Sequence, residues 1–139
     1  MPGLQHEVVI AAPPDRVWAV VSDVARWPER IPTVDEAERL DDGPLAVGSR
    51  TRLKQPRLSE AVWTVTELTD GRSFTWVSKS PGVTITGEHV VEPHPDGSRL
   101  VLGLRIAGPL SGLGWLMTKS LTRRYVETEG ASIKKAAEA

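Results

Sequence analysis

Three pairs of turn-forming residues divide the second half of the chain into β-rich runs of similar length. Asp70-Gly71, Pro81-Gly82 and Asp96-Gly97 stand between these runs. Short turns of this kind join antiparallel neighbours, because parallel strands would need a crossover of about a dozen residues or more. We therefore predict an antiparallel meander with strands at residues 60–68, 72–80, 83–93 and 99–107. Further strands are expected at residues 5–11, 35–40 and 49–54.

Alternation within the runs gives the predicted sheet one apolar and one polar face. The inward side chains are expected to be Trp63, Val65, Phe74, Trp76, Ile85, Gly87, His89, Val91, Leu100, Leu102, Leu104 and Ile106. Threonine, serine and charged side chains occupy the other positions, so that face is expected to contact water. The apolar face must be covered by another element.

The last thirty residues are expected to supply this cover as one long helix. One helical stripe collects Leu113, Met117, Leu121, Tyr125, Thr128, Ser132 and Ala136. A second stripe, roughly 100° away, contains Trp115, Val126, Ile133 and Ala137. We therefore expect the helix to pack on two sides, with the first stripe toward the sheet.

The segment "DRVWAVVSDVARWPERIP" predicts a helix that breaks and continues as a short helical stub. Its valines recur at three to four residues and form one apolar stripe, with Trp18 beside it. Pro13 and Pro14 suit the start of a helix, whereas Pro28 and Pro32 disfavour helical backbone in the residue before each of them. Two short helices should therefore follow the first strand.

Composition restricts the class of protein. A chain of 139 residues is expected to form one domain, residues 1–139, and a net charge of −1 offers no basic surface for nucleic acid. The absence of cysteine excludes disulfides and thiolate sites. No signal peptide and no run of eighteen apolar residues is evident. We expect a cytoplasmic protein without a membrane span.

The order of strand, two short helices, meander and long helix resembles an α+β helix-grip fold. The segments "IAAPPDRVWAVVSDVARWPERIP", "VGSRTRLKQP", "WTVTELTDGRSFTWVS" and the helix after "AGPLSGLGWLM" are similar to the SRPBCC, or START-like, superfamily. Within it, the chain most resembles the bacterial polyketide cyclase/dehydrase and lipid-transport-like proteins. This resemblance implies a curved sheet of six to seven strands around the C-terminal helix, with a ligand cavity between them. It also implies that Trp27 lies near the cavity mouth.

The sequence contains no familiar catalytic or cofactor motif. There is no GxSxG elbow, HExxH pair or P-loop, and "GPLSGLG" lacks the glycine spacing of a dinucleotide fingerprint. His89 and His94 are five residues apart on a predicted strand, which places them on opposite faces. We therefore expect neither a metal site nor a cofactor.

Three residues are candidates for chemistry. His89 is expected on the apolar face, where an imidazole needs a hydrogen-bond partner, and Tyr125 brings a hydroxyl to an apolar helical stripe. Arg52 belongs to an alternating basic strand with Arg50 and Lys54. Each also has a purely structural interpretation, as a hydrogen-bonded core residue or a solvated edge. The residues expected to border the cavity are Trp27, Trp63, Phe74, Trp76, His89, Leu102, Met117, Leu121 and Tyr125.

Three functions are compatible with this sequence. The first is a carrier or sensor that binds a hydrophobic or amphipathic small molecule, lipid-like or polyketide-like, between sheet and helix. The second is an aromatase/cyclase-like enzyme in which His89 and Tyr125 move protons and Arg52 holds a carbonyl or carboxylate. The third is a protein-interaction module that uses the apolar segment "IAGPLSGLGWLM". Few polar side chains are expected inside, and this favours the carrier.

Overall fold

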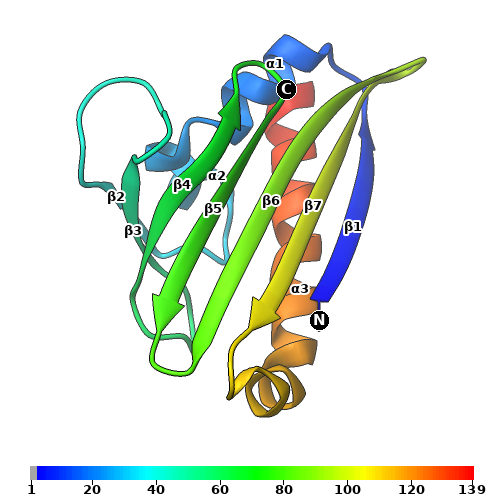
Figure 1. The fold of residues 1–139 in the computed structure, drawn as a ribbon. Helices are drawn as coiled ribbons and strands as arrows, with labels where there is room; N and C mark the ends of the chain where they lie inside the picture. The colour runs from blue at the N-terminus through cyan, green and yellow to red at the C-terminus, as the bar shows by residue number, and fades with distance from the viewer. Residues whose placement is uncertain (1–2) are drawn as a thin grey trace.

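The computed structural model describes residues 3–139 as a curved antiparallel sheet with helices on one face (Figure 1). Seven strands lie in the order β1-β7-β6-β5-β4-β3-β2. Their bounds are β1 Gly3–Ile10, β2 Glu36–Arg39, β3 Arg50–Lys54, β4 Ala61–Thr69, β5 Ser73–Ser80, β6 Val83–His94 and β7 Gly97–Ala107. The helices are α1 Pro14–Val21, the 3₁₀ turn η1 Val24–Arg26, α2 Trp27–Arg30 and α3 Ser111–Glu138. The predicted helix-grip architecture is confirmed.

The glycine of each predicted turn has the backbone conformation that such a turn requires. Gly71, Gly82 and Gly97 have φ values of 76°, 77° and 137°, which side-chain-bearing residues rarely adopt. Predicted and observed strand ends agree within about two residues, the usual uncertainty of such boundaries. The β4–β5 register shifts between Val65 and Glu67. This irregularity exposes Glu67, although simple alternation would place it inward beside Trp63.

The sheet carries α3 along its apolar face, and α1 and α2 lie toward the end of the molecule where α3 finishes (Figure 1). The buried valines Val17, Val20 and Val21 of α1 pack into the same core as the inward side chains of the strands. Trp18 contacts the ring of Phe74 edge-on, with 6.2 Å between ring centroids. Trp18 thus packs the first helix against the sheet.

The rotation of α3 differs from the prediction. Its buried residues are Val126, Gly130, Ile133 and Ala137, most of them on the second predicted stripe, whereas Met117 of the first stripe is 75% exposed. Gly130 explains the close approach of helix and strand. A β-carbon at this position would lie 2.9 Å from the Val8 side chain. Small residues therefore let the helix press on β1, and Leu113 and Met117 at the start of the first stripe turn outward.

No helix within residues 3–139 is long and apolar enough to cross a membrane.

Candidate functional site

A half-open pocket of about 180 Å³ lies between the sheet and α3. The strands β3 to β7 provide its floor and walls, and α2, α3 and the loop between β3 and β4 surround the rest. The side chains and backbone that line it belong to Trp27, Leu53, Gln55, Leu58, Trp63, Trp76, Ile85, Gly87, Glu88, His89, Leu102, Gly103, Leu104, Thr118, Thr122, Tyr125, Val126 and Glu129. The cavity that the resemblance implied is therefore present.

Three tryptophans form an aromatic wall. Trp27 and Trp76 meet edge-on with ring centroids 5.4 Å apart, and Trp63 and Trp76 are 5.5 Å apart at a tilt of 32°. The indole nitrogen of Trp27 donates a hydrogen bond to the carbonyl oxygen of Val21, 3.3 Å away. This bond anchors the tryptophan that follows the helix break. Trp27 is 1% exposed, so it forms an inner wall rather than the mouth.

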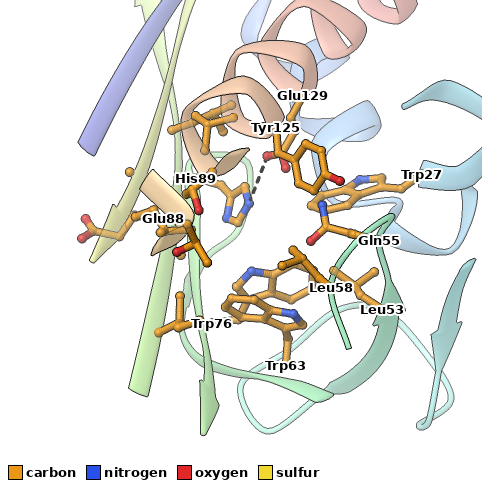
Figure 2. Close-up of a pocket in the computed structure, with 18 residues that line it drawn as sticks. Trp27, Leu53, Gln55, Leu58, Trp63, Trp76, Glu88, His89, Tyr125 and Glu129 are labelled. Atoms are coloured by element: carbon orange, nitrogen blue, oxygen red, sulfur yellow. Dashed lines mark ion pairs between the residues drawn. The ribbon is translucent and has the colours of Figure 1, made fainter. Parts of the chain in front are cut away.

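His89 brings the main polar group into this aromatic surrounding (Figure 2). Its ring stacks on Phe74 with 4.2 Å between centroids. Its Nδ1 lies 3.3 Å from the carbonyl oxygen of Phe74, and its Nε2 lies 3.5 Å from Oε2 of Glu129 on α3. The two side chains are only 5% and 18% exposed. Strand β6 and helix α3 thus place a histidine and a carboxyl group together at one end of the pocket.

The hydrogen-bond partners of His89 restrict where the protons lie. A carbonyl oxygen can only accept, so Nδ1 carries the hydrogen in its contact with Phe74. A bare Nε2 lone pair facing an ionised carboxylate would be repulsive. The contact with Glu129 is therefore favourable when a second proton lies on Nε2 or on the carboxyl group. The geometry therefore places an imidazole nitrogen and a carboxyl oxygen in contact inside a mostly apolar pocket.

Tyr125 connects α3 to the loop at the pocket rim. Its hydroxyl donates a hydrogen bond to the carbonyl oxygen of Pro56, in the loop that also contributes Gln55 and Leu58 to the lining. Arg57, next in this loop, has a positive φ of 67°. Tyr125 thus lines the pocket and also holds the rim loop in place.

The structure brings together six of the nine residues expected to border the cavity. Trp27, Trp63, Trp76, His89, Leu102 and Tyr125 line the pocket. The other three do not. Phe74 is fully buried behind His89, Leu121 is half-buried beside the pocket, and Met117 projects from the surface. The expected place of Met117 in the cavity wall is wrong because α3 is rotated as described above.

Arg52 does not reach the pocket either. Its neighbours Thr51 and Leu53 point into the core, so Arg52 lies on the outer face of β3. There it makes ion pairs with Glu38 at 3.0 Å and Glu60 at 2.7 Å. The hydrogen bond with Glu38 and then the charge of Glu60 raise the pKa of Arg52 above its ordinary value. The arginine cannot hold a substrate in the pocket from this position.

Sequence reasoning missed the polar side of the pocket. Thr118, Thr122 and Glu129 of α3 line it, together with Gln55 from the rim loop. The helical signal was available, because Thr118, Thr122 and Val126 recur every four residues and Glu129 follows three residues later. The side chain of Glu88, by contrast, points away from the pocket (Figure 2). Within residues 3–139, no group of three or more metal-ligating side chains is present.

Solved structures with the same fold include two aromatase/cyclases. The Zhui aromatase/cyclase from Streptomyces sp. R1128 is 21% identical with a TM-score of 0.80, over 99% of this chain and 93% of that one. The di-domain ARO/CYC BexL from the BE-7585A biosynthetic pathway is 21% identical with a TM-score of 0.75, over 99% of this chain and 47% of that longer one. At these identities the likeness shows the fold alone.

A third similar structure is TTHA0849 from Thermus thermophilus, 21% identical with a TM-score of 0.78 over 98% of this chain and 97% of that one. No curated protein matches the sequence. The family described as "Polyketide cyclase / dehydrase and lipid transport" matches residues 1–138, nearly the whole chain. With the helix-grip fold and the pocket between sheet and α3, this match shows that the chain belongs to the polyketide cyclase/dehydrase and lipid transport family.

Proposed function

We propose that the protein binds a small, flat, mostly apolar molecule that carries at least one polar group, such as a hydroxylated or ketone-bearing ring of polyketide type. The observation that carries this proposal is the pocket itself, with a wall of three tryptophans and the His89–Glu129 pair at one end. Flat aromatic walls favour ring-shaped ligands, and a few convergent polar groups orient them. The family and its ligand-binding fold support the same conclusion.

The size of the pocket restricts the ligand. A cavity of about 150 Å³ in another protein accommodates benzene, so about 180 Å³ suits one ring or two fused small rings. A longer acyl chain or a larger polycycle would have to extend through the open side of the pocket. The bound molecule is therefore expected to be partly covered, with its polar group toward Glu129.

Tryptophan fluorescence provides the test. Phenol, 1-naphthol and anthrone should quench the emission of the purified protein, with 1-naphthol bound more tightly than phenol because it buries more apolar area. Trp76→Ala should weaken 1-naphthol binding by about 3 kcal/mol, roughly 100-fold. Trp115→Ala is the matched control, because Trp115 does not line the pocket, and it should leave the affinity unchanged.

Thermal melts must accompany these titrations, since Trp76 is 3% exposed and also stabilises the core. Unchanged 1-naphthol affinity in a folded Trp76→Ala protein would contradict the proposal. Native mass spectrometry of freshly purified protein offers an independent measurement, because a co-purifying small molecule would reveal the ligand class by its mass.

A second candidate function, a cyclase- or dehydratase-like enzyme, is favoured by the contact between His89 and Glu129, whose Nε2 and Oε2 atoms are 3.5 Å apart. In the ionised form of the pair, the carboxylate of Glu129 would remove a proton from the carbon beside a substrate carbonyl. The Nε2–H of His89 would protonate a departing hydroxyl group, so that water leaves and a C=C bond forms. The proton on Glu129 then returns to His89. Both groups lie within reach of the same pocket end, as such acid–base catalysis requires.

The two functions differ in what the pair contributes. For an enzyme, His89→Gln and Glu129→Gln should each abolish dehydration of a ring-bearing β-hydroxy ketone while changing its dissociation constant only a few-fold, because acid–base groups act mainly in the transition state. If the protein is a carrier, neither the wild type nor any of these variants should dehydrate the compound.

Tyr125→Phe tests what the tyrosine hydroxyl contributes. Loss of its hydrogen bond to the carbonyl oxygen of Pro56 should loosen the rim loop and speed the release of the ligand.

A further inference from the structure

The start of α3 exposes four large apolar side chains side by side. Leu110, Leu113, Leu116 and Met117, here called the apolar tip, are all exposed, Leu116 and Met117 to 79% and 75%. Other exposed large apolar residues, such as Val9, Val47 and Val62, are separated from one another along the chain. Single exposed apolar side chains are ordinary on protein surfaces, whereas a contiguous group marks a contact surface.

The apolar tip lies at one extremity of the molecule. The first turns of α3 follow the end of β7 and extend beyond it, beside the turn between β5 and β6 (Figure 1). Leu110 packs there against Gly82, where an added β-carbon would lie 2.7 Å from the leucine side chain. On the opposite side of the same helix, Thr118 and Thr122 face the pocket. The tip therefore projects away from the fold, on the side of α3 opposite the pocket.

Positive charge follows the apolar tip along the same helix. Lys119, Arg123 and Arg124 are exposed. Among the ion pairs within 4.0 Å that residues 3–139 form, none involves these three cations, nor the nearby Glu127. Arg123 and Arg124 follow Leu116 and Met117 by seven residues, which is close to two helical turns. The two arginines therefore lie on the helix face that carries the apolar tip. The protein as a whole has a net charge of −1, so this basic cluster is a local feature.

We propose that this end of α3 docks on an anionic lipid bilayer, with the apolar tip in the interface and the basic cluster on the phosphate groups. The spacing fits this arrangement. Met117 and Arg124 are seven residues apart, roughly 10 Å along a helix at about 1.5 Å per residue. Interfacial helices bury their apolar face about 5–10 Å into the boundary between headgroups and acyl chains. With α3 entering the bilayer end-on to a similar depth, the guanidinium groups, roughly 10 Å further along the helix, would lie at headgroup depth.

A lipid surface fits the tip better than a protein partner does. A stable protein interface buries about 800 Å² on each side. Even a large aromatic side chain supplies only about 150–250 Å², so four smaller and partly covered side chains supply roughly half of that area. The tip is also a projecting helix end and not a groove. A bilayer accepts such a shape, and its anionic headgroups complement the unpaired cations. Docking needs no bound ligand, so this inference stands independently of the proposed function.

Vesicle co-sedimentation tests the docking. The wild-type chain should bind phosphatidylcholine vesicles that contain phosphatidylserine at least tenfold more tightly than vesicles of phosphatidylcholine alone, and should be released when NaCl rises from about 50 to about 500 mM. Replacing Leu116 and Met117 together by serine should abolish binding. Replacing Lys119, Arg123 and Arg124 by glutamine should each weaken binding up to about fivefold.

Val47→Ser is the matched control, because Val47 is 64% exposed in a loop remote from α3 in sequence, and it should bind like the wild type. Three results would overturn the proposal: no sedimentation with the anionic vesicles at low salt, unaltered binding by the Leu116/Met117 double variant, or equal affinity for both vesicle types.

Gel filtration can give a fourth contradicting result. A wild-type dimer that Leu116→Ser converts to monomer would assign the tip to a second copy of the chain. Titration of the same variants with 1-naphthol, followed by tryptophan fluorescence, shows separately whether the pocket is intact.

Discussion

At the scale of single residues, a glycine in the middle of β6 makes room for the aromatic wall. A glycine inside a strand usually weakens it, so its presence often indicates a close approach by another group. A β-carbon on Gly87 would lie 3.0 Å from Nε1 and 3.1 Å from Cδ1 of the Trp76 indole, and 3.7 Å from the His89 ring. Because Gly87 has no side chain, the Trp76 indole can lie close against the sheet and does not narrow the pocket.

Gly87→Ala should therefore narrow the pocket, because the indole of Trp76 must move by a few tenths of an ångström. We expect affinity for 1-naphthol to fall at least fivefold and affinity for phenol to change less, as measured by fluorescence titration. Gly103→Ala is the control. Only the backbone of Gly103 borders the pocket; an added β-carbon would make an ordinary contact, 3.6 Å from the Glu88 side chain, which points away from the pocket. Both affinities should therefore stay as in the wild type. An equal loss of affinity for both ligands would mean that Gly87 contributes to the stability of the fold and does not set the size of ligand that the pocket accepts.

At the scale of elements, α3 consists of two halves with different environments. Its second half is part of the core, where Val126, Gly130, Ile133 and Ala137 are buried. Its first half has no fully buried residue: Thr118 and Thr122 face the pocket, and most of its large apolar side chains are exposed. One continuous helix therefore joins a structural segment to a segment available for contacts outside the fold.

This division predicts that similar truncations in the two halves of α3 change the free energy of unfolding by very different amounts. Ile133 is fully buried, so Ile133→Ala should cost about 2–5 kcal/mol through lost burial and the cavity left behind. Leu116 is mostly exposed, so Leu116→Ala should change stability by less than about 0.5 kcal/mol. Urea unfolding of both variants measures the difference. A large loss of stability in Leu116→Ala would show that the first half of α3 packs against the fold in solution.

At the scale of the whole molecule, the pocket couples ligand binding to stability. It lies at the centre of the contact between the sheet, α2 and α3, so a ligand that fills it bridges elements that otherwise meet around an opening. A ligand that binds only the folded state stabilises it by mass action.

A bound ligand should therefore raise the melting temperature. At a concentration 100 times the dissociation constant, the gain is about 2.7 kcal/mol, which for a domain of this size corresponds to roughly 10 °C. Differential scanning fluorimetry with 1-naphthol measures the shift, and Trp76→Ala provides the control in which most of it should disappear. A melting temperature that stays constant while fluorescence reports saturation would mean that the unfolded chain binds 1-naphthol equally well, which would contradict binding in a pocket that only the folded state forms.

Local sequence patterns determined the elements and their order. The turn glycines, the alternation of apolar side chains and the proline-bounded helices depend on neighbours within a few residues, so they were readable from the sequence. The same patterns placed Trp63, Trp76 and His89 on the inner face, because side chains alternate strictly along a strand. Together with the family resemblance, they were enough to predict the helix-grip fold and a cavity beneath α3.

Only the tertiary structure decided how α3 is rotated, and with it the chemistry of the pocket. Two stripes of the helix could have faced the sheet, and the choice depended on the close approach of Gly130 to Val8, residues far apart in the chain. That rotation turned Met117 outward and brought Glu129 to His89, forty residues earlier in sequence. Contacts between distant segments follow from packing and not from local periodicity. The physical reason is that the contact energy of a helix face depends on the surface it meets.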